Sequence, residues 1–379
     1  MKTYAEINEK IKKGTAVVLT AEEVSEMAKT LSPKEIAEKV DVVTTATFGA
    51  MCSSGAFLNF GHANPPIRME RIELNGVRVS GGLAAVDTYV GATDCNLSSP
   101  AYGGAHIIED LVNGKEIALE AWGKGTDCYP RKHIKAIITK DSINEAILYN
   151  PRNAYQNYNV ATNTTDQIKY TYMGTLLPKM RNASYSSAGE LSPLLNDPEC
   201  RTIGLGTHIF LCGTEGYVTW NGTQFHSTKA VNEYGIPTSN ARTIAVIGDL
   251  KNMTTKYLRG AYIEKYGVTL YVGIGIPIPV LDEDMARRLS IRNDQIETTV
   301  VDYGNGNQPL GKTNYAALQS GTIEINGHKV RTAPLSSLAK AREIAAILKS
   351  WIRKGDFLLS EPVRPMPVHT SLKALTGED

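Results

Sequence analysis

Two asparagine–glycine pairs place the strongest limits on what this chain can fold into. Residues 67–80, IRMERIELNGVRVS, alternate apolar and polar side chains about Asn75-Gly76, and residues 321–332, GTIEINGHKVRT, do the same about Asn326-Gly327. An Asn-Gly pair accepts the positive φ angles of a two-residue hairpin turn, so each segment predicts two antiparallel strands. Regions near both ends of the chain therefore contribute to β-sheets.

Helix-start signals lie between the strand-like segments. Thr20-Ala-Glu-Glu23 and Ser32-Pro-Lys-Glu35 match the capping box, in which an N-cap hydroxyl and a glutamate three residues later bond each other's backbone amides. The same signals predict helices that begin at Asp141, Asp282 and Ser336 or Ser337, the last of them ending at Gly355. Because helices and strands are interleaved, the fold class is α/β or α+β, with mixed sheets, several β-hairpins and flanking helices.

The chain is long enough for two domains or for one large domain. The polar, turn-prone segment NPRNAYQNYNVATN, residues 150–163, is a candidate boundary and also a candidate carrier of function. It divides the chain into an N-terminal α/β part, residues 1–160, which carries the cysteine loops, and a C-terminal mixed α/β part, residues 161–379, which ends in the long helix. A single large domain is the alternative.

Charge and hydropathy argue against several classes of partner. The chain has 40 basic and 39 acidic residues, a formal net charge of +1, which gives no reason to expect nucleic acid or an anionic membrane. No apolar run reaches the roughly 18 residues of a membrane helix, and the charged N-terminal segment lacks the apolar core of a signal peptide. We therefore expect a cytoplasmic protein with no membrane partner and no nucleic acid partner.

Five cysteines, at positions 52, 95, 128, 200 and 212, are far apart and include no C-x-x-C pair. This spacing predicts free thiols in a reducing compartment, with no zinc or iron–sulfur site built from a local run of ligands. Cys52 lies in MCSSGAFLNFGH, directly after the strand-like run VDVVTTATFGA. A helix beginning at Ser53 or Ser54 would stabilise a thiolate or persulfide on Cys52 through its free amides. The alternative is a small structural cysteine in a Gly/Ser turn.

Cys128 lies in the loop GKGTDCYPRKH, residues 123–133. Four potentially cationic side chains lie within five residues of it and would lower the pKa of its thiol, whereas Asp127 opposes this effect. The alternative is a solvated charged loop that holds an incidental cysteine. Cys95 is a weaker candidate, and Cys200 and Cys212 are interpreted as structural.

Residues 306–313, GNQPLGKT, match the phosphate-binding pattern G-x-x-x-x-G-K-[ST]. A phosphate loop must lead into a helix whose N-terminus faces the phosphate, but only TNYAALQSG separates Lys312 from the next strand-like run. We therefore interpret the match as accidental. No G-x-G-x-x-G follows a strand as a nicotinamide site requires, and no G-x-S-x-G turn of a hydrolase is present.

Several long stretches together resemble one known family. They are MCSSGAFLNFGH, YGGAHIIEDLVNGK with the following GTDCYPR, NPRNAYQNYN, RTIGLGTHIFL and LKSWIRKGDFLLSEPV. These stretches resemble the homocysteine biosynthesis protein family, also called the L-aspartate semialdehyde sulfurtransferases, of methanogenic archaea and anaerobic bacteria. The resemblance covers nearly the whole chain. Some members carry a C-terminal pair of CBS regulatory domains, and this chain resembles the form without them.

The resemblance implies a sulfurtransferase that converts aspartate semialdehyde to homocysteine with sulfide and two electrons. It places the essential family cysteine at Cys52 and a second motif cysteine at Cys128. Because the sequence shows no fingerprint of a bound cofactor, none is expected with confidence. The family is associated with a small ferredoxin-like protein, and we expect the electrons to come from such an external partner.

Our mechanistic hypothesis gives each candidate residue a role. Cys52 carries sulfur as a thiolate or persulfide that attacks the aldehyde, Cys128 acts as the second thiol, and His62 donates a proton for water loss. The expected substrate-binding residues are Ser53, Ser54 and Gly55, through backbone amides that stabilise the oxyanion, with Arg152, through the α-carboxylate, and Arg131. A non-catalytic sulfur carrier or scaffold is the alternative function. The hairpins and exposed strand edges make a homo-oligomer reasonable.

Overall fold

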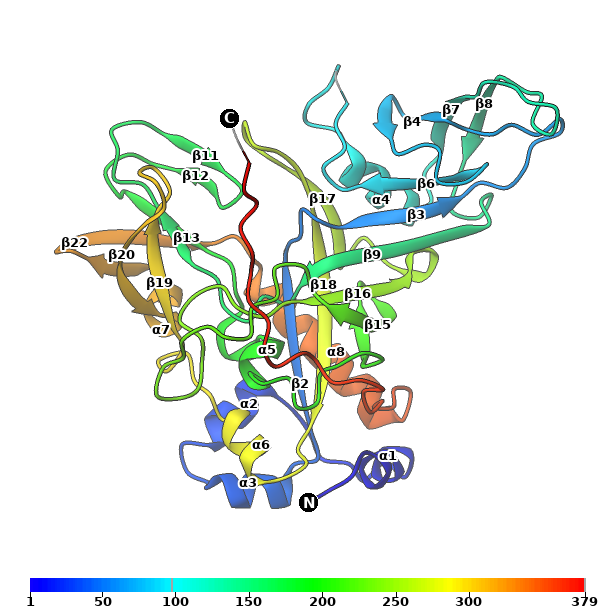
Figure 1. Cartoon of the computed structure of the whole chain (residues 1–379). Helices are drawn as coiled ribbons and strands as arrows, with labels where there is room; N and C mark the ends of the chain where they lie inside the picture. Colours follow the sequence, from blue (N-terminus) through cyan, green and yellow to red (C-terminus); the bar gives the residue numbers. More distant parts are fainter. Residues whose placement is uncertain (97, 378–379) are drawn as a thin grey trace.

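The computed structural model describes residues 1–96 and 98–377 and has a mixed α/β fold (Figure 1). A ten-stranded sheet runs through the centre of the molecule. Its strands, in spatial order, are β1 (Val18–Thr20), β2 (Val42–Ala50), β18 (Gly267–Pro279), β14 (His208–Leu211), β15 (Thr214–Asn221), β16 (Ile244–Asp249), β9 (Glu145–Asn153), β3 (Gly55–Asn59) and β6 (Asp87–Gly91), with β17 (Leu258–Ile263) paired to β18 outside this order.

Three smaller sheets flank the central sheet. The six-stranded sheet has the order β20 (Gln308–Asn314), β19 (Glu297–Asp302), β10 (Val160–Thr162), β13 (Asn182–Tyr185), β22 (His328–Pro334) and β21 (Thr322–Ile325). The four-stranded sheet has the order β5 (Val77–Val79), β4 (Arg71–Leu74), β7 (Ile117–Trp122) and β8 (His133–Ile138). The two-stranded sheet pairs β11 (Lys169–Thr171) with β12 (Gly174–Leu176). The six-stranded and four-stranded sheets lie at opposite sides of the molecule in Figure 1.

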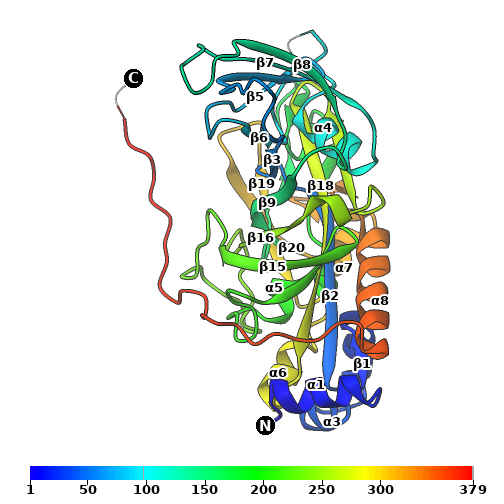
Figure 2. The same ribbon diagram turned by 90° about the vertical axis from the view of Figure 1, so that its right-hand side faces the viewer.

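Most of the helices lie at the ends or on one face of the central sheet (Figures 1 and 2). The helices are α1 (Tyr4–Lys12), α2 (Ala21–Met27), α3 (Pro33–Lys39), α4 (Gly104–Val112), α5 (Pro193–Asn196), α6 (Glu283–Arg288), α7 (Tyr315–Gln319), α8 (Leu338–Lys354) and the 3-10 turns η1 (Gly189–Leu191) and η2 (Leu250–Asn252). Helix α7 packs instead against β20, β21 and β22 of the six-stranded sheet. Figure 2 shows α8 lying along β2. The contact between α8 and β18 is close because Gly273 and Gly275 present no side chain to Ile344.

Most of the local predictions are confirmed. Both Asn-Gly pairs form the turns of hairpins, β4–β5 and β21–β22, with positive φ at each residue. Thr20 and Ser32 form complete capping boxes at α2 and α3. Asp282 caps α6, and α8 begins after Ser337 and ends at Gly355 in the left-handed conformation.

The helix predicted from Asp141 is wrong. Residues 139–144 form a turn that leads directly into β9. In this turn the Ser142 hydroxyl accepts from the Thr139 amide (2.8 Å) and donates to the Thr139 carbonyl (3.1 Å). Such local side-chain bonds offer the backbone an alternative to helix formation.

The central sheet combines strands from both sides of residue 160. β1, β2, β3, β6 and β9 come before this position, and β14 to β18 come after it. The boundary between the two predicted parts stays a prediction. For the candidate site, the important result is that both parts of the chain contribute to the same sheet.

The phosphate-loop pattern lies in a strand. Gly311, Lys312 and Thr313 belong to β20 and pair with β19, and the helix that follows, α7, has five residues. A strand paired in this way does not form the amide cradle that a phosphate needs. The geometry of a phosphate loop is therefore not formed by the residues of β20, and the interpretation of the match as accidental stays a prediction.

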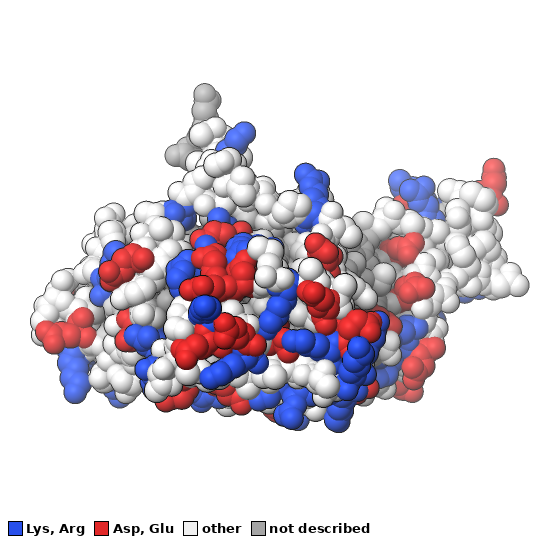
Figure 3. Space-filling model, turned by 90° about the horizontal axis from the view of Figure 1, so that it is seen from below, with Lys and Arg blue, Asp and Glu red and all other residues white. Residues whose placement is uncertain are grey.

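The surface shows mixed charge. Figure 3 shows acidic and basic side chains interspersed on the face seen from below. Ion pairs such as Arg201 with Asp282 (2.7 Å) and Lys10 with the buried Asp41 (2.7 Å) join the two signs. Within residues 1–96 and 98–377, no helix is long and apolar enough to span a membrane.

Replacing Gly104 by alanine should destabilise the fold by more than about 3 kcal/mol. A Cβ atom at this position would lie 1.8 Å from the carbonyl oxygen of Gly91, the last residue of β6. Gly49→Ala is the matched control, because a Cβ atom there would meet its nearest neighbour, the Ser336 Cβ, at an ordinary 3.5 Å. Urea unfolding of both variants measures the difference, and equal stability would show that the 91–94 loop can move away.

Candidate active site

Cys52 lies in a tight turn between two strands of the central sheet. β2 ends at Ala50, and Gly55 begins β3. The Met51 amide donates to the Leu270 carbonyl of β18 (2.8 Å), and the Ala92 amide donates to the Ser54 carbonyl (2.8 Å). Neighbours on both sides therefore fix the turn that presents the thiol.

The helix considered at Ser53 or Ser54 does not form, because the chain enters β3 directly. Gly55 pairs with Tyr149 of β9 and with Gly91 of β6. The Ser54 amide is also occupied, since it donates to the Met51 carbonyl (3.0 Å). A row of free helix amides, the basis of the expected oxyanion stabilisation, is therefore not present at this turn.

One hydroxyl group contacts the Cys52 thiol, and a second lies near it. The Sγ atom lies 3.2 Å from the Oγ1 atom of Thr269, which is fully buried on β18. Tyr266 lies near this thiol and lines the same cavity: its burial, and secondly the charge of a Cys52 thiolate, raise the pKa of the Tyr266 hydroxyl. The half-buried thiol of Cys52 thus lies beside a threonine hydroxyl and near a tyrosine.

The thiol faces a polar cavity of about 450 Å³. Tyrosines are prominent in its wall, and Arg152 is the one charged side chain among the described residues that line it. The lining residues are Ala50, Cys52, Ser53, Thr93, Arg152, Tyr155, Tyr158, Tyr172, Met173, Ser186, Gln224, Tyr266 and Leu335. The cavity is therefore large enough for a small polar substrate and carries positive charge at one point.

The segment NPRNAYQNYN supplies three of these side chains at every third position: Arg152, Tyr155 and Tyr158. The residues between them are buried and hold the segment in place. Gln156 donates to the carbonyls of Leu194 (3.0 Å) and Pro198 (2.7 Å). Asn157 similarly donates to the carbonyls of Pro237 (2.6 Å) and Glu297 (2.7 Å). These buried hydrogen bonds hold the segment firmly in place along the cavity wall.

Backbone strain is concentrated at the same place. Ala154, which is buried next to Tyr155, has a φ of 48°, and the cavity residue Gln224 has a φ of 61°. Residues other than glycine adopt this conformation only when their surroundings impose it, and such positions often mark functional sites. The Nε atom of Arg152 donates to Thr223 (3.0 Å), the neighbour of Gln224, which fixes the guanidinium group.

Two tyrosines of the cavity wall form a hydrogen-bonded cluster with Tyr303. The Tyr158 hydroxyl donates to the Tyr172 hydroxyl (3.1 Å), which lies 2.7 Å from the hydroxyl of Tyr303 behind the cavity wall. The rings of Tyr155 and Tyr266 pack against this pair. Burial raises the pKa of Tyr155, Tyr158 and Tyr303, so these phenols stay neutral.

His62, Cys128 and Arg131 come together at a different place. Strand β3 leads away from the turn of Cys52 and spans about 13 Å at roughly 3.3 Å per residue, and His62 lies beyond its far end. There the His62 ring stacks on Tyr129 at 6.1 Å, and Arg131 donates to the Asn64 carbonyl (2.8 Å). Cys128 is exposed in the loop between β7 and β8, with Thr126 3.6 Å from its sulfur. None of the three lines the cavity.

Several residues of the site carried no local motif in the sequence. Thr269, Tyr172 and Tyr266 reach Cys52 or its cavity from distant strands and loops. One compositional signal was available: the chain has 18 tyrosines and only 6 phenylalanines. Such an excess indicates that many aromatic side chains here need a hydroxyl group.

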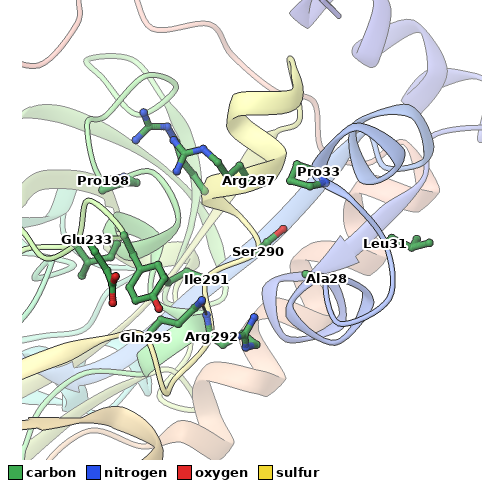
Figure 4. A pocket seen from close by; sticks show the side chains of 13 residues that line it. Ala28, Leu31, Pro33, Pro198, Glu233, Arg287, Ser290, Ile291, Arg292 and Gln295 are labelled. Atoms are coloured by element: carbon green, nitrogen blue, oxygen red, sulfur yellow. Dashed lines mark hydrogen bonds between the residues drawn. The ribbon is translucent and has the colours of Figure 1, made fainter.

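A second pocket, of about 260 Å³, lies between α3, α6 and the loop of Glu233 (Figure 4). Figure 4 shows Arg287, Arg292 and Glu233 at its rim. Its arginines already have acidic partners: Arg287 pairs with Asp284 (2.7 Å) and Arg288 pairs with Glu199. None of the described residues that line it is a cysteine or a histidine. The cavity of Cys52 is therefore the better candidate active site. Across the described ranges, no three His, Cys, Asp or Glu side chains gather to hold a metal ion.

Comparison with known proteins identifies close relatives. L-aspartate semialdehyde sulfurtransferase of Methanocaldococcus jannaschii is 52% identical over 382 residues, which cover 96% of this chain and 73% of that protein. The protein of the same name from Methanosarcina acetivorans is 48% identical, over 99% of this chain and 74% of its own length. An uncharacterized protein of Methanothermobacter thermautotrophicus is 27% identical over 89% of this chain. No solved structure gives a significant match.

A thiol on the wall of a small polar cavity, beside one arginine, is typical of an enzyme that forms a covalent bond to a small anionic substrate. The family model described as homocysteine biosynthesis enzyme, sulfur-incorporation, matches residues 16–359. The chain belongs to this family. The resemblance noted in the sequence is therefore confirmed.

Proposed function

We propose that this chain is an L-aspartate semialdehyde sulfurtransferase, which forms L-homocysteine from the aldehyde, sulfide and two electrons. The names of the two relatives at about 50% identity support this activity. The structural observation that carries it is that Cys52 and Arg152, far apart in sequence, line the same cavity. Cys52 can bind sulfur, and Arg152 can bind a carboxylate.

The overall reaction balances only with a reductant. The aldehyde, one molecule of hydrogen sulfide, two protons and two electrons give the thiol and one water. Addition of sulfide followed by loss of water gives a thioaldehyde, so the two electrons reduce its C=S bond. We propose that they come from an external ferredoxin-like protein. A cytoplasmic location and a homo-oligomer remain part of the same proposal.

Cys52 is proposed to carry the sulfur as a persulfide. The terminal sulfur attacks the aldehyde carbon, a C–S bond forms, and the former carbonyl oxygen takes a proton. A second thiol then attacks the sulfur of Cys52, which breaks the S–S bond, releases the thiohemiacetal and leaves a disulfide. Sulfide opens that disulfide and restores the persulfide, so the protein returns to its starting state.

Tyr266 is proposed as the proton donor in place of His62. Tyr266 lines the cavity near the Cys52 thiol, which contributes to its raised pKa, whereas His62 lies beyond the far end of β3. A donor has to reach the oxygen that leaves as water, at about 2.6–3.2 Å or through one water molecule. The hydroxyl of Thr269, 3.2 Å from the same sulfur, is proposed to orient the thiol.

Cys128 is proposed as the second thiol. Cys128 is exposed and does not line the cavity. In this proposal, the thiol that reaches Cys52 is therefore Cys128 of another copy of the chain. The unpaired edge of β8, where Ile137 is 59% exposed, lies beside this loop and is open to such a contact.

We expect Cys128→Ser to lose turnover while Cys52 still accepts one sulfur atom, because the S–S bond can form but cannot be opened. Mass spectrometry of the protein after incubation with a persulfide donor measures the loading. Mixing the Cys128→Ser and Cys52→Ser variants tests the contact between copies. Restored homocysteine formation would support it, and normal turnover by Cys128→Ser alone would remove Cys128 from the mechanism.

The direct test of the function is anaerobic. The purified chain is mixed with aspartate semialdehyde, sulfide and a low-potential reductant, with and without a ferredoxin-like protein, and homocysteine is quantified. Product formation supports the proposal. If no product forms and the aldehyde neither reacts nor stabilises the protein, the sulfur-carrier alternative takes its place.

A further inference from the structure

Among the described residues of the cavity wall there is no acidic side chain, the usual partner for the ammonium group of an amino-acid substrate. We take the substrate to be aspartate semialdehyde, as in the proposed function on which this inference rests. This substrate carries an α-carboxylate, an aldehyde and an α-ammonium group. Arg152 suits the carboxylate and Cys52 suits the aldehyde, but among the described residues no aspartate or glutamate lines the cavity to pair with the ammonium group. A buried cation without a partner is costly, so another group must stabilise it.

Four tyrosine rings line the same cavity: Tyr155, Tyr158, Tyr172 and Tyr266. Their centroids lie close together, at 4.8 Å for Tyr155–Tyr158, 6.4 Å for Tyr158–Tyr172 and 6.1 Å for Tyr172–Tyr266. A cation is attracted to the face of a tyrosine ring within about 6 Å of its centroid. A small cation in this cavity would therefore lie within reach of more than one ring.

The rings are held in place by contacts that do not need a ligand. The hydroxyl of Tyr172 lies between those of Tyr158 and Tyr303, at 3.1 Å and 2.7 Å. Tyr155 and Tyr158 belong to a segment that the buried side-chain amides of Gln156 and Asn157 hold in place. Such a pre-formed cluster loses little side-chain entropy when it binds a ligand.

Neutral rings also suit the other charges in the cavity. A carboxylate would pair with Arg152 and would compete with the substrate, and it would repel a thiolate on Cys52. Neutral tyrosines attract a cation, but they neither pair with Arg152 nor repel a thiolate on Cys52. The chain makes the same kind of contact close by, where the Lys265 Nζ atom lies 4.4 Å from the centroid of the Tyr170 ring.

We propose that Tyr155, Tyr158, Tyr172 and Tyr266 form an aromatic cage that binds the α-ammonium group of the substrate. With Arg152 on the carboxylate and Cys52 at the aldehyde, the substrate is held at three points. The cage makes the enzyme selective for aldehydes that are amino acids over those that have lost the amino group.

The test compares two aldehydes that differ only in that group, aspartate semialdehyde and 4-oxobutanoate. Tyr172→Leu removes the central ring, and Tyr172→Phe keeps the ring and removes the hydroxyl. We expect the leucine variant to lose about 5- to 30-fold in kcat/KM for aspartate semialdehyde, with little change for 4-oxobutanoate. The phenylalanine variant should keep most of the preference. Tyr262→Leu, an exposed tyrosine outside the cavity, is the control.

Calorimetric binding of L-homoserine and 4-hydroxybutanoate, which carry no aldehyde, tests the cage without any turnover. If Tyr172→Leu does not fold, Tyr155→Leu replaces it, because Tyr155 lies at the end of the cluster. Parent protein that binds L-homoserine no better than 4-hydroxybutanoate overturns the cage, as does an equal loss for both aldehydes in the leucine variant. Parent protein that binds L-homoserine selectively but forms no homocysteine supports the cage and contradicts the proposed function.

Discussion

Cys52→Ser should abolish homocysteine formation, with a loss on the order of 10³-fold or more in turnover. A serine hydroxyl in this turn can still contact Thr269, so the local structure should be kept. It cannot carry sulfur, however, and the bond to the aldehyde carbon cannot form through it. The measurement is homocysteine released per protein chain under anaerobic conditions with sulfide and reductant.

Cys95→Ser is the matched control for this prediction. Cys95 is an exposed thiol in the loop that follows β6, it bonds to the Thr93 carbonyl (3.3 Å), and it does not line the cavity. We expect this variant to keep parental turnover. Product from Cys52→Ser at the parental rate would return Cys52 to a structural role, and the sulfur would then have to enter as free sulfide.

Arg152→Ala should raise the KM for aspartate semialdehyde by about 10- to 100-fold, the loss expected for a hydrogen bond to a charged group. Arg152 is the charged residue of the cavity lining, and its Nε bond to Thr223 orients the guanidinium group before substrate binds. Arg152→Lys keeps the charge but loses the two-pronged geometry, so an intermediate KM is expected. Steady-state kinetics with varied aldehyde concentration provide the measurement.

The exposed Arg181, which is not part of the cavity lining, supplies the control variant Arg181→Ala. An unchanged KM in this control shows that loss of a positive charge alone has no effect. If Arg152→Ala instead lowers turnover at saturating aldehyde with no change in KM, Arg152 does not bind the ground-state carboxylate.

The sequence was sufficient where a feature depends on neighbouring residues. The Asn-Gly hairpins, the capping boxes at Thr20 and Ser32, and the end of α8 at Gly355 are all local, and each formed as predicted. The segment of Arg152 could also be singled out, because its run of polar and aromatic residues suggested a loop with a function.

The chemistry around the thiol could not be predicted in the same way. Thr269 contacts Cys52 across 217 positions in the chain, and nothing in the sequence near residue 52 indicates it. The helix considered after Cys52 gave way to β3 because pairing with β6 and β9 on both sides stabilises an extended chain there. Tertiary contacts of this kind override local preference.

The cavity wall is assembled from segments that extend from Ala50 to Leu335. Contacts between residues so distant in sequence form late and slowly in folding, since each requires the closure of a long loop. The site therefore has no partial form: a fragment that ends before Tyr266 would keep Cys52 and Arg152 but lose one wall of the cavity. During synthesis the Cys52 thiol thus emerges long before its pocket exists, and the complete cavity can form only when nearly the whole chain has folded.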